Sequence, residues 1–402
     1  MEIKFTSKDC VEAAVAEIIG QEALEAGFTA GKKLRVKLGI DPTSPNVHLG
    51  RSIPLWRLRA FQELGHEIHL IIGDFTGQIG DTSDKESERP MLSVETVQNN
   101  LSRYLEQMWM ILNVEKKDQV IVHYNSEWLN PLSLSQLSYM ADAFSVNHFI
   151  KRELIERRLQ EGSRVSLREM LYPLMQGYDS VKVQADVEIG GTDQRFNLLA
   201  GRILQEQAGQ PPQAIIMNTL IRGTDGRKMS SSWGNVISLL DSPADKFGKL
   251  MAVRDDCIAD YLLVLPLSVR PFTADELTAG IEKGENPRDY KLRLARTLVT
   301  LYHGEDEAKR VEDEFINQFS HHQKPVDIPE ISVSELGAVE WELPALLEKI
   351  GLADSRSDGR RLIRQGGVRL DDWVVKEENE TVRLDRSVLL QVGKRKFIRI
   401  LP

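Results

Sequence analysis

The stretch Gly39-Ile40-Asp41-Pro42-Thr43-Ser44-Pro45-Asn46-Val47-His48-Leu49-Gly50-Arg51 decides the fold. A β-branched and apolar run, residues 34–38, precedes it, and residues 52–64 carry apolar side chains at helical spacing. A further buried strand is expected over residues 66–74, which completes a strand-helix-strand unit of parallel type. The first amides of such a helix have no intrahelical partner, so the sequence predicts a polyphosphate site where His48 and Gly50 lie.

The alternation of strands and helices continues and predicts an α/β fold. We expect helices over residues 8–25, 94–112, 134–145, 146–160 and 195–207, and strands over residues 119–124, 181–189 and 214–220. Residues 233–319 have helical periodicity, with helix starts near Pro243 and Pro287. His66 and His69 are interpreted as polar groups at the edge of a strand and not as metal ligands, because no third ligand has a useful spacing.

Two polar loops follow predicted strands, where α/β sheets bind their ligands. In residues 75–90, Asp81 suits an ammonium group, and Lys85 and Arg89 suit phosphates; the alternative is an ordinary charged surface loop. In residues 223–232, Lys228 and three serines suit a polyphosphate whose charge shifts during a reaction. A serine-rich linker is the alternative there.

Three polar residues recur along a predicted helix over residues 168–179. Tyr172, Gln176 and Asp179 are spaced by four and three residues, so they share one helix face. Such a face would supply a hydroxyl, a carboxamide and a carboxylate to a pocket wall. The alternative is an exposed polar helix face.

Composition and charge describe an ordinary globular chain of 402 residues, long enough for two or three domains. Its two cysteines exclude a disulfide framework, and the sequence shows neither a signal peptide nor an apolar run of bilayer length, so we expect a cytoplasmic protein. Residues 343–402 hold 13 Lys and Arg against 9 Asp and Glu, although the whole chain has a net charge of -9. The basic end favours a nucleic-acid partner; a solvated face of mixed charge is the alternative.

Four segments together resemble a known family. Residues 48–51 and 228–232 resemble the two signatures of class I aminoacyl-tRNA synthetases. Residues 172–179 and 188–194 are similar to the substrate-pocket motifs of the bacterial tyrosyl-tRNA synthetases, and residues 352–368 resemble the S4 RNA-binding module. The resemblance implies a Rossmann-like parallel-sheet catalytic domain (1–225), a helical anticodon-binding domain with the signature loop (226–320), a linker (321–342) and a small α+β S4-like domain (343–402).

The resemblance also implies which residues act. The residues expected in catalysis are Thr43, His48, Lys85, Arg89, Lys228 and Ser231. Those expected to bind ATP are Asp41, His48, Gly50, Arg51, Asp193, Lys228 and Met229. Those expected to bind tyrosine are Asp81, Tyr172, Gln176, Asp179 and Gln194, with Asp179 accepting from the phenol. Those expected to bind RNA are Arg356, Arg360, Arg361 and Arg364.

This chain departs from the family pattern at three positions. Arg51 stands in place of a second histidine, and Ser231 in place of a second loop lysine. Lys37 stands where the best-known subgroup has a tyrosine that also reads the substrate hydroxyl. Lysine cannot accept a hydrogen bond, which leaves Asp179 as the main acceptor. With this lysine and the form of residues 190–194, the chain resembles the second bacterial subgroup.

The resemblance implies activation of L-tyrosine by ATP and transfer to the 3' terminal adenosine of tRNA(Tyr). We expect Mg²⁺ to arrive with ATP without a dedicated protein site, and we expect a homodimer. A tryptophan-specific synthetase is the rival within the class. Because Arg51 and Ser231 depart from the pattern, a catalytically weakened RNA-binding protein on the same scaffold is the second rival.

Overall fold

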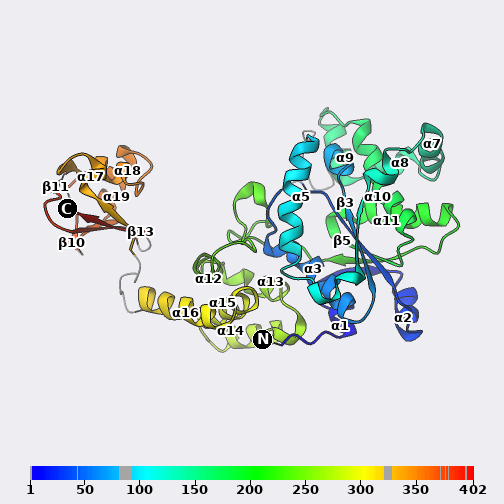
Figure 1. Ribbon diagram of the computed structural model, residues 1–402, viewed down its shortest axis with the longest axis horizontal. Helices are drawn as coiled ribbons and strands as arrows, with labels where there is room; N and C mark the ends of the chain where they lie inside the picture. Colours follow the sequence, from blue (N-terminus) through cyan, green and yellow to red (C-terminus); the bar gives the residue numbers. More distant parts are fainter. Residues whose placement is uncertain are drawn as a thin grey trace. The chain divides into compact units, whose positions relative to one another are not determined.

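The computed structural model of the protein describes residues 2–42, 44–80, 93–320, 328–371, 373–375, 377–378, 380–393 and 396–402. Its contacts divide the chain into two compact units, residues 1–312 and 313–402 (Figure 1). None of the helices in these described ranges combines the length and the apolar character that a membrane span requires.

A six-stranded sheet forms the centre of the first unit. Its order is β1-β6-β5-β2-β3-β4, and every neighbouring pair is parallel except β1 with β6. The strands are β1 (Val15–Ile19), β2 (Arg35–Ile40), β3 (Glu67–Ile72), β4 (Val120–Tyr124), β5 (Val187–Gly191) and β6 (Ala214–Asn218). This parallel sheet confirms the predicted α/β class.

The order of the sheet reverses at β2. β3 and β4 lie on one side of it, and β5 and β6 lie on the other. In sheets of this kind the connecting segments diverge at the reversal and leave a crevice beyond the carboxyl ends of the strands. Residues 39–51 leave β2 at this crevice, so the deciding stretch lies where a ligand is expected.

Helices connect and cover the strands. In the first part of the chain they are α1 (Ser7–Val11), α2 (Gln21–Thr29), α3 (Leu49–Glu63), α4 (Thr76–Ile79), α5 (Val94–Met108), α6 (Ser126–Leu129), α7 (Leu134–Asp142), α8 (Val146–Ile150), α9 (Glu153–Gln160), α10 (Leu167–Val183) and α11 (Arg195–Gln207). A helical region follows, with α12 (Pro243–Met251), α13 (Ile258–Leu262), α14 (Ala274–Glu282), α15 (Pro287–His303) and α16 (Glu305–Ser320). The predicted helix starts at Pro243 and Pro287 are confirmed: Ser242 and Asn286 cap them.

The amino-terminal prediction was wrong. The structure has two helices, α1 and α2, with β1 between them, in place of one helix over residues 8–25. β1 pairs antiparallel with β6, about 200 residues later in the sequence, with Ile19 opposite Ile215. This distant partner decides the conformation, because local apolar spacing cannot distinguish a short edge strand from a helix turn.

α10, which carries the predicted polar face, lies beside α11 (Figure 1). A Cβ on Gly177 of α10 would lie 3.0 Å from the carbonyl oxygen of Ala200 on α11, so glycine permits their close approach. α10 continues to Val183 and ends at Gln184, whose φ is 50°. The strand predicted over residues 181–189 therefore begins later, at Val187, because its first residues complete the helix.

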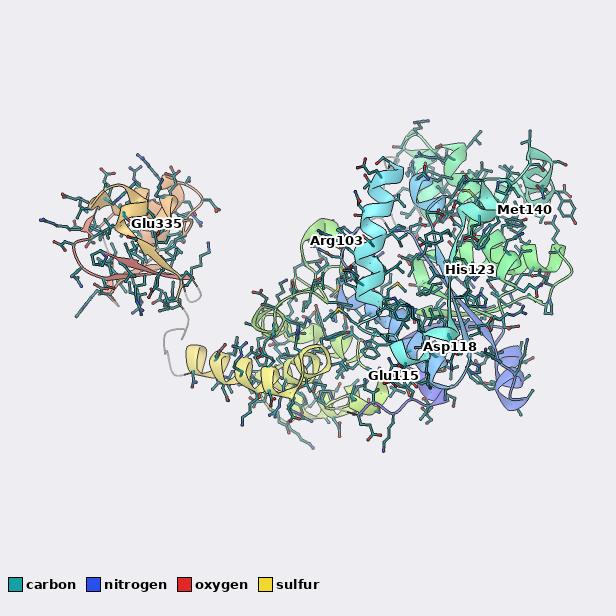
Figure 2. All side chains as sticks on the ribbon, in the orientation of Figure 1. Arg103, Glu115, Asp118, His123, Met140 and Glu335 are labelled. Atoms are coloured by element: carbon teal, nitrogen blue, oxygen red, sulfur yellow. The ribbon has the colours of Figure 1, made fainter. Side chains whose placement is uncertain are left out.

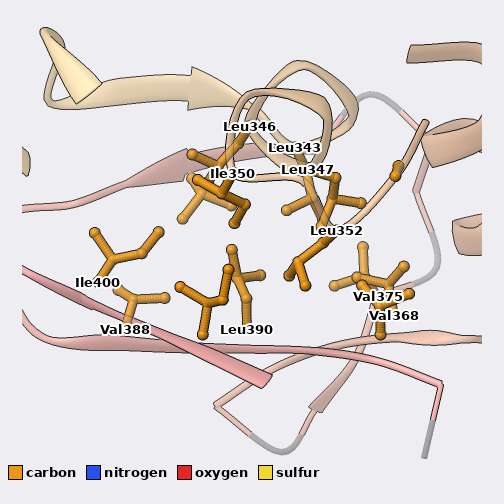
Figure 3. Packing of buried hydrophobic residues seen from close by; sticks show 14 of the residues in the cluster. Leu343, Leu346, Leu347, Ile350, Leu352, Val368, Val375, Val388, Leu390 and Ile400 are labelled. Atoms are coloured by element: carbon orange, nitrogen blue, oxygen red, sulfur yellow. The ribbon is translucent and has the colours of Figure 1, made fainter. Parts of the chain in front are cut away.

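The second unit contains a five-stranded sheet of order β10-β9-β12-β13-β7 and a two-stranded sheet of β11 with β8. Its strands are β7 (Glu330–Ser332), β8 (Glu340–Glu342), β9 (Val368–Leu370), β10 (Trp373–Val374), β11 (Thr381–Arg383), β12 (Val388–Val392) and β13 (Lys396–Leu401), and its helices are α17 (Val333–Leu336), α18 (Leu343–Lys349) and α19 (Arg356–Arg364). Leucines of α18 pack against Val388, Leu390 and Ile400 of the sheet (Figure 3). Residues 321–342 were expected to be a linker, and β7, α17 and β8 lie within this range. β7 pairs with β13.

A glycine in α19 has a packing role that helix propensity does not reveal. Gly359 is expected to weaken this helix by roughly 1 kcal/mol relative to alanine. In the structure a Cβ at Gly359 would lie 3.2 Å from the Cα and the carbonyl oxygen of Pro344 on α18. The glycine therefore permits α18 and α19 to pack closely, which offsets its low propensity.

Candidate active site

A cavity of about 640 Å³ opens at the carboxyl edge of the six-stranded sheet. The ends of β2, β5 and β6, the start of α3, the polar face of α10 and the loop of residues 219–233 surround it. It brings together Asp41, His48, Gly50, Arg51, Tyr172, Gln176, Asp179, Asp193, Gln194, Lys228, Met229 and Ser231 from the residues expected in the site. Thr43, Asp81, Lys85 and Arg89 lie outside the described residues.

The start of α3 is joined through the backbone to the segment that follows the lysine loop. The Leu49 amide donates to the Ile237 carbonyl, and the Leu239 amide donates to the Val47 carbonyl, each at 2.9 Å. Residues 47–49 thus form one short antiparallel contact with residues 237–239, directly after the lysine loop. This pairing fixes one end of the loop to the start of α3.

The first amides of α3 are already engaged, which corrects the expectation that they are left for phosphate. Arg51 and Ser52 donate to the His48 carbonyl, and Leu49 donates to Ile237. The Gly50 amide faces the sulfur of Met229 at 3.4 Å, and a thioether is a weak acceptor. The side chains around the cavity, more than these amides, are therefore the groups available to an anion.

His48 presents an unpaired ring nitrogen at the start of α3. The residue is 9% exposed, and its buried Nδ1 has no hydrogen-bond partner among the described residues. Burial, helped by the charges of Arg51 and Lys228, lowers the pKa of His48 to about 3, so the imidazole is neutral near pH 7. A Cβ on Gly50 would lie 3.1 Å from this Nδ1, which explains the value of glycine there.

The loop lysine faces the cavity beside an acidic residue. Lys228 Nζ lies 3.0 Å from a carboxylate oxygen of Asp193, which follows β5. Asn235 holds the loop: it accepts from the Ser230 amide at 2.9 Å and donates to the carbonyl of Lys228 at 3.1 Å. Asn235 lies beyond the segment that the sequence identified, and it is 4% exposed.

The two departures from the signature pattern both line the cavity. The Arg51 guanidinium carbon lies 5.9 Å from the centre of the Tyr104 ring on α5. Ser231 begins a short 3-10 turn, Ser231–Trp233, and Trp233 also lines the cavity. Arg51 therefore supplies a fixed positive charge to the end of the cavity near His48, and Ser231 supplies a hydroxyl.

Asp179 is buried at the α10 wall of the cavity. One of its oxygens accepts from Trp128 Nε1 at 2.8 Å, and the other lies 3.4 Å from Asn125 Nδ2. Burial raises the pKa of Asp179 to about 7, although Lys37 and these two donors oppose the rise. The carboxylate retains acceptor capacity toward the cavity, since each of its oxygens has two lone pairs.

Asp41 connects two helices at the cavity, α10 and α4. Its carboxylate accepts from the Tyr172 hydroxyl at 2.8 Å and from the Thr76 hydroxyl at 2.7 Å. A Cβ on Gly73 would lie 1.9 Å from an Asp41 oxygen, so only glycine leaves room for this carboxylate. Asp41 was expected to bind ATP, and these hydrogen bonds to Tyr172 and Thr76 place it in the wall of the cavity.

Sequence reasoning missed Thr76, Asn125 and Trp128. Asn125 donates to Thr76 at 3.0 Å as well as to Asp179, which links two predicted clusters. Asn125 directly follows β4, and Trp128 lies in α6, the short helix that comes next. Their position after a parallel strand was a signal that could have identified them.

The histidines in and next to β3 are engaged with protein groups. His69 contacts Glu67 at 2.8 Å and His123, which is labelled in Figure 2, at 2.9 Å. His66 accepts from the Leu34 amide at 3.2 Å. Within the described ranges, no group of three or more His, Cys, Asp or Glu is placed to hold a metal ion.

The arginines expected to contact RNA lie on α19 of the second unit. Three of them form ion pairs at or near the surface: Arg356 with Glu348 at 3.3 Å, Arg361 with Asp358 at 2.5 Å and Arg364 with Glu378 at 2.7 Å. These carboxylates reduce the positive charge that four arginines alone would give. Exposed pairs of this kind have a small net stability, so a polyanion can displace them at low cost.

Family models match both units. Residues 29–320 match the model described as tRNA synthetases class I (W and Y), and residues 343–388 match the S4 domain. A tyrosine–tRNA ligase of Moorella thermoacetica is 43% identical over 393 residues, covering 96% of this chain and 93% of that protein. One of Thermotoga maritima is 41% identical over 387 residues, covering 96% and 95%.

Solved structures show the same fold. The tyrosyl-tRNA synthetase of Archaeoglobus fulgidus, crystallised with L-tyrosine, superposes with a TM-score of 0.59 at 22% identity. The superposition covers 76% of this chain and 98% of that one.

Proposed function

The chain belongs to the tyrosine–tRNA ligases of the class I synthetase family, and we propose that its cavity binds tyrosine at Asp179 and the ATP triphosphate between His48 and Lys228. The enzyme activates tyrosine with ATP and transfers it to tRNA. The observation that supports this assignment best is the buried carboxylate of Asp179, which lines one cavity with the two signature segments. A buried acceptor is suited to a substrate hydroxyl.

The first step needs orientation and positive charge more than it needs a base. The tyrosine carboxylate is ionised near pH 7 and attacks the α-phosphorus, forming tyrosyl-adenylate while pyrophosphate leaves. Lys228 and Arg51 stabilise the negative charge on the leaving oxygens, and the ring of His48 donates to a phosphate oxygen. In the second step, a hydroxyl of the terminal adenosine of tRNA(Tyr) attacks the activated carbonyl carbon, and AMP leaves.

The remaining residues of the cavity orient the two substrates. Tyr172 and Gln176 hold the ammonium of tyrosine, and Gln194 lies near the reacting carboxylate. Asp193 binds the ribose of ATP, which requires Lys228 to leave its present contact with that carboxylate. Mg²⁺ is bound by the phosphates of ATP, because a small hard cation keeps phosphate and water oxygens as ligands.

Pyrophosphate exchange tests the assignment directly. The full-length enzyme is expected to exchange labelled pyrophosphate into ATP with tyrosine, and with neither tryptophan nor phenylalanine at equal concentration. Exchange supported by tryptophan alone would identify the rival specificity. No exchange with any of the three, with tRNA binding intact, would identify an RNA-binding protein on the same scaffold.

We expect the dissociation constant for tyrosine to fall as the pH rises from 6 to 8. The pKa of Asp179 is about 7 in the free enzyme, and the phenol donates its hydrogen bond to the ionised form. Affinity is therefore lost as the carboxylate is protonated, by up to about tenfold for each pH unit below the pKa. Equilibrium dialysis across this range measures the effect. An Asp179→Asn variant should show no such dependence, and a flat profile for the unaltered enzyme would contradict the prediction.

The second unit is proposed to bind tRNA through Arg356, Arg360, Arg361 and Arg364. A chain that ends at Ser320 should therefore retain tyrosine-dependent exchange within about twofold. It should charge tRNA with a KM for tRNA raised roughly tenfold or more, because several phosphate contacts are lost. Parallel assays of exchange and charging measure the difference. An equal loss of both activities would mean that the unit acts only in stability.

The functional form is proposed to be a homodimer in the cytoplasm. Large apolar side chains are exposed on α7, α8 and α10, with Leu134, Val146 and Leu167 each at least 74% exposed. Exposed apolar side chains of this kind indicate a surface that a partner covers, and a second copy of the chain is the partner expected from the family. Sedimentation equilibrium tests this, since a monomer at micromolar concentration would contradict it.

A further inference from the structure

A buried ion pair lies behind the amino-acid end of the cavity. Lys37 on β2 and Glu188 on β5 are opposite each other in the parallel register, and their side chains are 0% and 1% exposed. Lys37 Nζ lies 2.8 Å from Glu188 Oε1. Neither Lys37 nor Glu188 is among the described residues that line the cavity, so the pair does not touch a ligand there.

The protons of Lys37 are all used inside the protein. Besides the contact with Glu188, Nζ donates to the backbone carbonyl oxygen of Gln176 at 2.9 Å and to Ser180 Oγ at 2.7 Å. An ammonium group has three protons, so none remains for a substrate. Lys37 therefore differs in role from the tyrosine of the other subgroup, and it holds Glu188 and α10 in place.

Glu188 collects hydrogen bonds from three side chains. It accepts from Gln176 Nε2 at 3.2 Å, from Ser180 Oγ at 3.2 Å and from Gln213 Nε2. A carboxylate that is paired with Lys37 is ionised and can only accept. The nitrogen of the Gln176 carboxamide must therefore face Glu188.

This orientation decides what Gln176 offers to a ligand. Gln176 lines the cavity and its carboxamide nitrogen is taken by Glu188, so the oxygen is the group that this side chain has left for a ligand in that space. An ammonium group can only donate, and it would be repelled by the NH₂ of a reversed carboxamide. Fixing one orientation is thus a means of recognising the α-amino group.

We propose that Glu188, held by Lys37, positions the Gln176 carboxamide with its oxygen toward the substrate ammonium, so that a pair outside the cavity contributes to amino-acid recognition. The inference rests on the proposed place of Gln176 in the tyrosine site. The backbone of α11 packs tightly against this network. A Cβ on Gly201 of α11 would lie 2.6 Å from Gln213 Nε2 and 2.9 Å from Ser180 Oγ.

The alternative is that the ion pair only fastens α10 to the sheet. Replacing both buried charges together is often neutral for stability, whereas removing one leaves the other unpaired. The double variant Lys37→Met/Glu188→Leu therefore removes the orientation while leaving no buried charge. Single Glu188→Gln is a second variant, which keeps the shape of the side chain but leaves the Lys37 charge unpaired, so its result is compared with that of the double variant.

The test compares two ligands of the full-length enzyme by equilibrium dialysis. One is tyrosine, and the other is 3-(4-hydroxyphenyl)propionate, which has the same phenol and carboxylate without the amino group. In both variants the dissociation constant for tyrosine should rise about tenfold or more, and that for the analogue less than about twofold. Changes in the phenol end affect both ligands equally, so the ratio of the two constants isolates the amino group.

A matched control is Gln213→Met. Gln213 is equally buried and donates to the same carboxylate, but it does not contact Gln176 in any of its hydrogen bonds to described residues. Its ratio should stay within about twofold of the unaltered enzyme, because only the Gln176 contact sets the orientation. Equal weakening of both ligands in the double variant, or no weakening of either, would overturn the inference.

Gln176→Met separates this inference from the proposed site. If that variant weakens tyrosine selectively and the Glu188 variants do not, the orienting role of Glu188 is wrong and the site stands. If Gln176→Met leaves the ratio unchanged, the ammonium is not held at Gln176, and both the placement and the inference fail.

Discussion

Replacing Asp179 with alanine is expected to lower the ratio of kcat/KM for tyrosine to that for phenylalanine by about 100-fold. The hydrogen bond of the phenol to a buried carboxylate is charge-assisted, and such bonds contribute about 1.5–3 kcal/mol. Phenylalanine has no hydroxyl and leaves the carboxylate without that partner, which is costly in a buried site. The change therefore acts on tyrosine and leaves phenylalanine activation equal or faster.

Pyrophosphate exchange with each amino acid measures the ratio. Trp128→Phe is the matched control, because it removes the 2.8 Å donor to Asp179 and keeps the carboxylate. It should change the ratio by less than about tenfold, as expected for one neutral donor. If Asp179→Ala left the ratio unchanged, another group would read the hydroxyl, and the orientation of tyrosine in the cavity would have to be reversed.

Replacing Lys228 with alanine is expected to lower kcat for pyrophosphate exchange by about 10²–10³-fold, as loss of one positioned charge on a developing anion does in other active sites. Ser231 occupies the position at which the family has a second loop lysine, so Lys228 is the cation of residues 228–232. The dissociation constant for tyrosine should not change, because Asp179 and Gln176 hold that ligand at the other end of the cavity. Rapid-quench measurement of adenylate formation separates the two effects.

Arg227→Ala is the control for this loop. Arg227 is the adjacent cation, but its guanidinium stacks on Trp233 at 4.8 Å and pairs with Asp225 at 2.6 Å. Its removal should lower kcat by less than about threefold, because exposed pairs contribute little. A loss from Arg227→Ala as large as that from Lys228→Ala would mean that loop conformation, and not the Lys228 charge, limits the reaction.

The parallel sheet and the α10 face could be predicted from the sequence because local information is sufficient for both. The spacing of Tyr172, Gln176 and Asp179 fixes their common face on any helix, and strands at the ends of βα units repeat a short apolar pattern. β1 could not be predicted in this way, since only its pairing with β6 makes it a strand.

The part of the site that the sequence did not reveal depends on tertiary contacts. Trp128 and Asn125 reach Asp179 across about 50 residues of sequence, and Asn235 reaches back to Lys228 from beyond the predicted loop. Glu188 was part of a matching motif, but its partnership with Lys37 follows from the pairing of β2 with β5. Spacing in the sequence contains no record of such neighbours.

The backbone pairing of residues 47–49 with residues 237–239 also has a consequence for synthesis of the chain. It closes a loop of about 190 residues, so the ribosome must release more than half of the protein before the start of α3 meets its partner. Contacts between such distant segments are slow to form. The nascent chain therefore passes through a period in which its first βα unit can fold while the ATP end of the cavity is still incomplete, and catalytic competence arises late in translation.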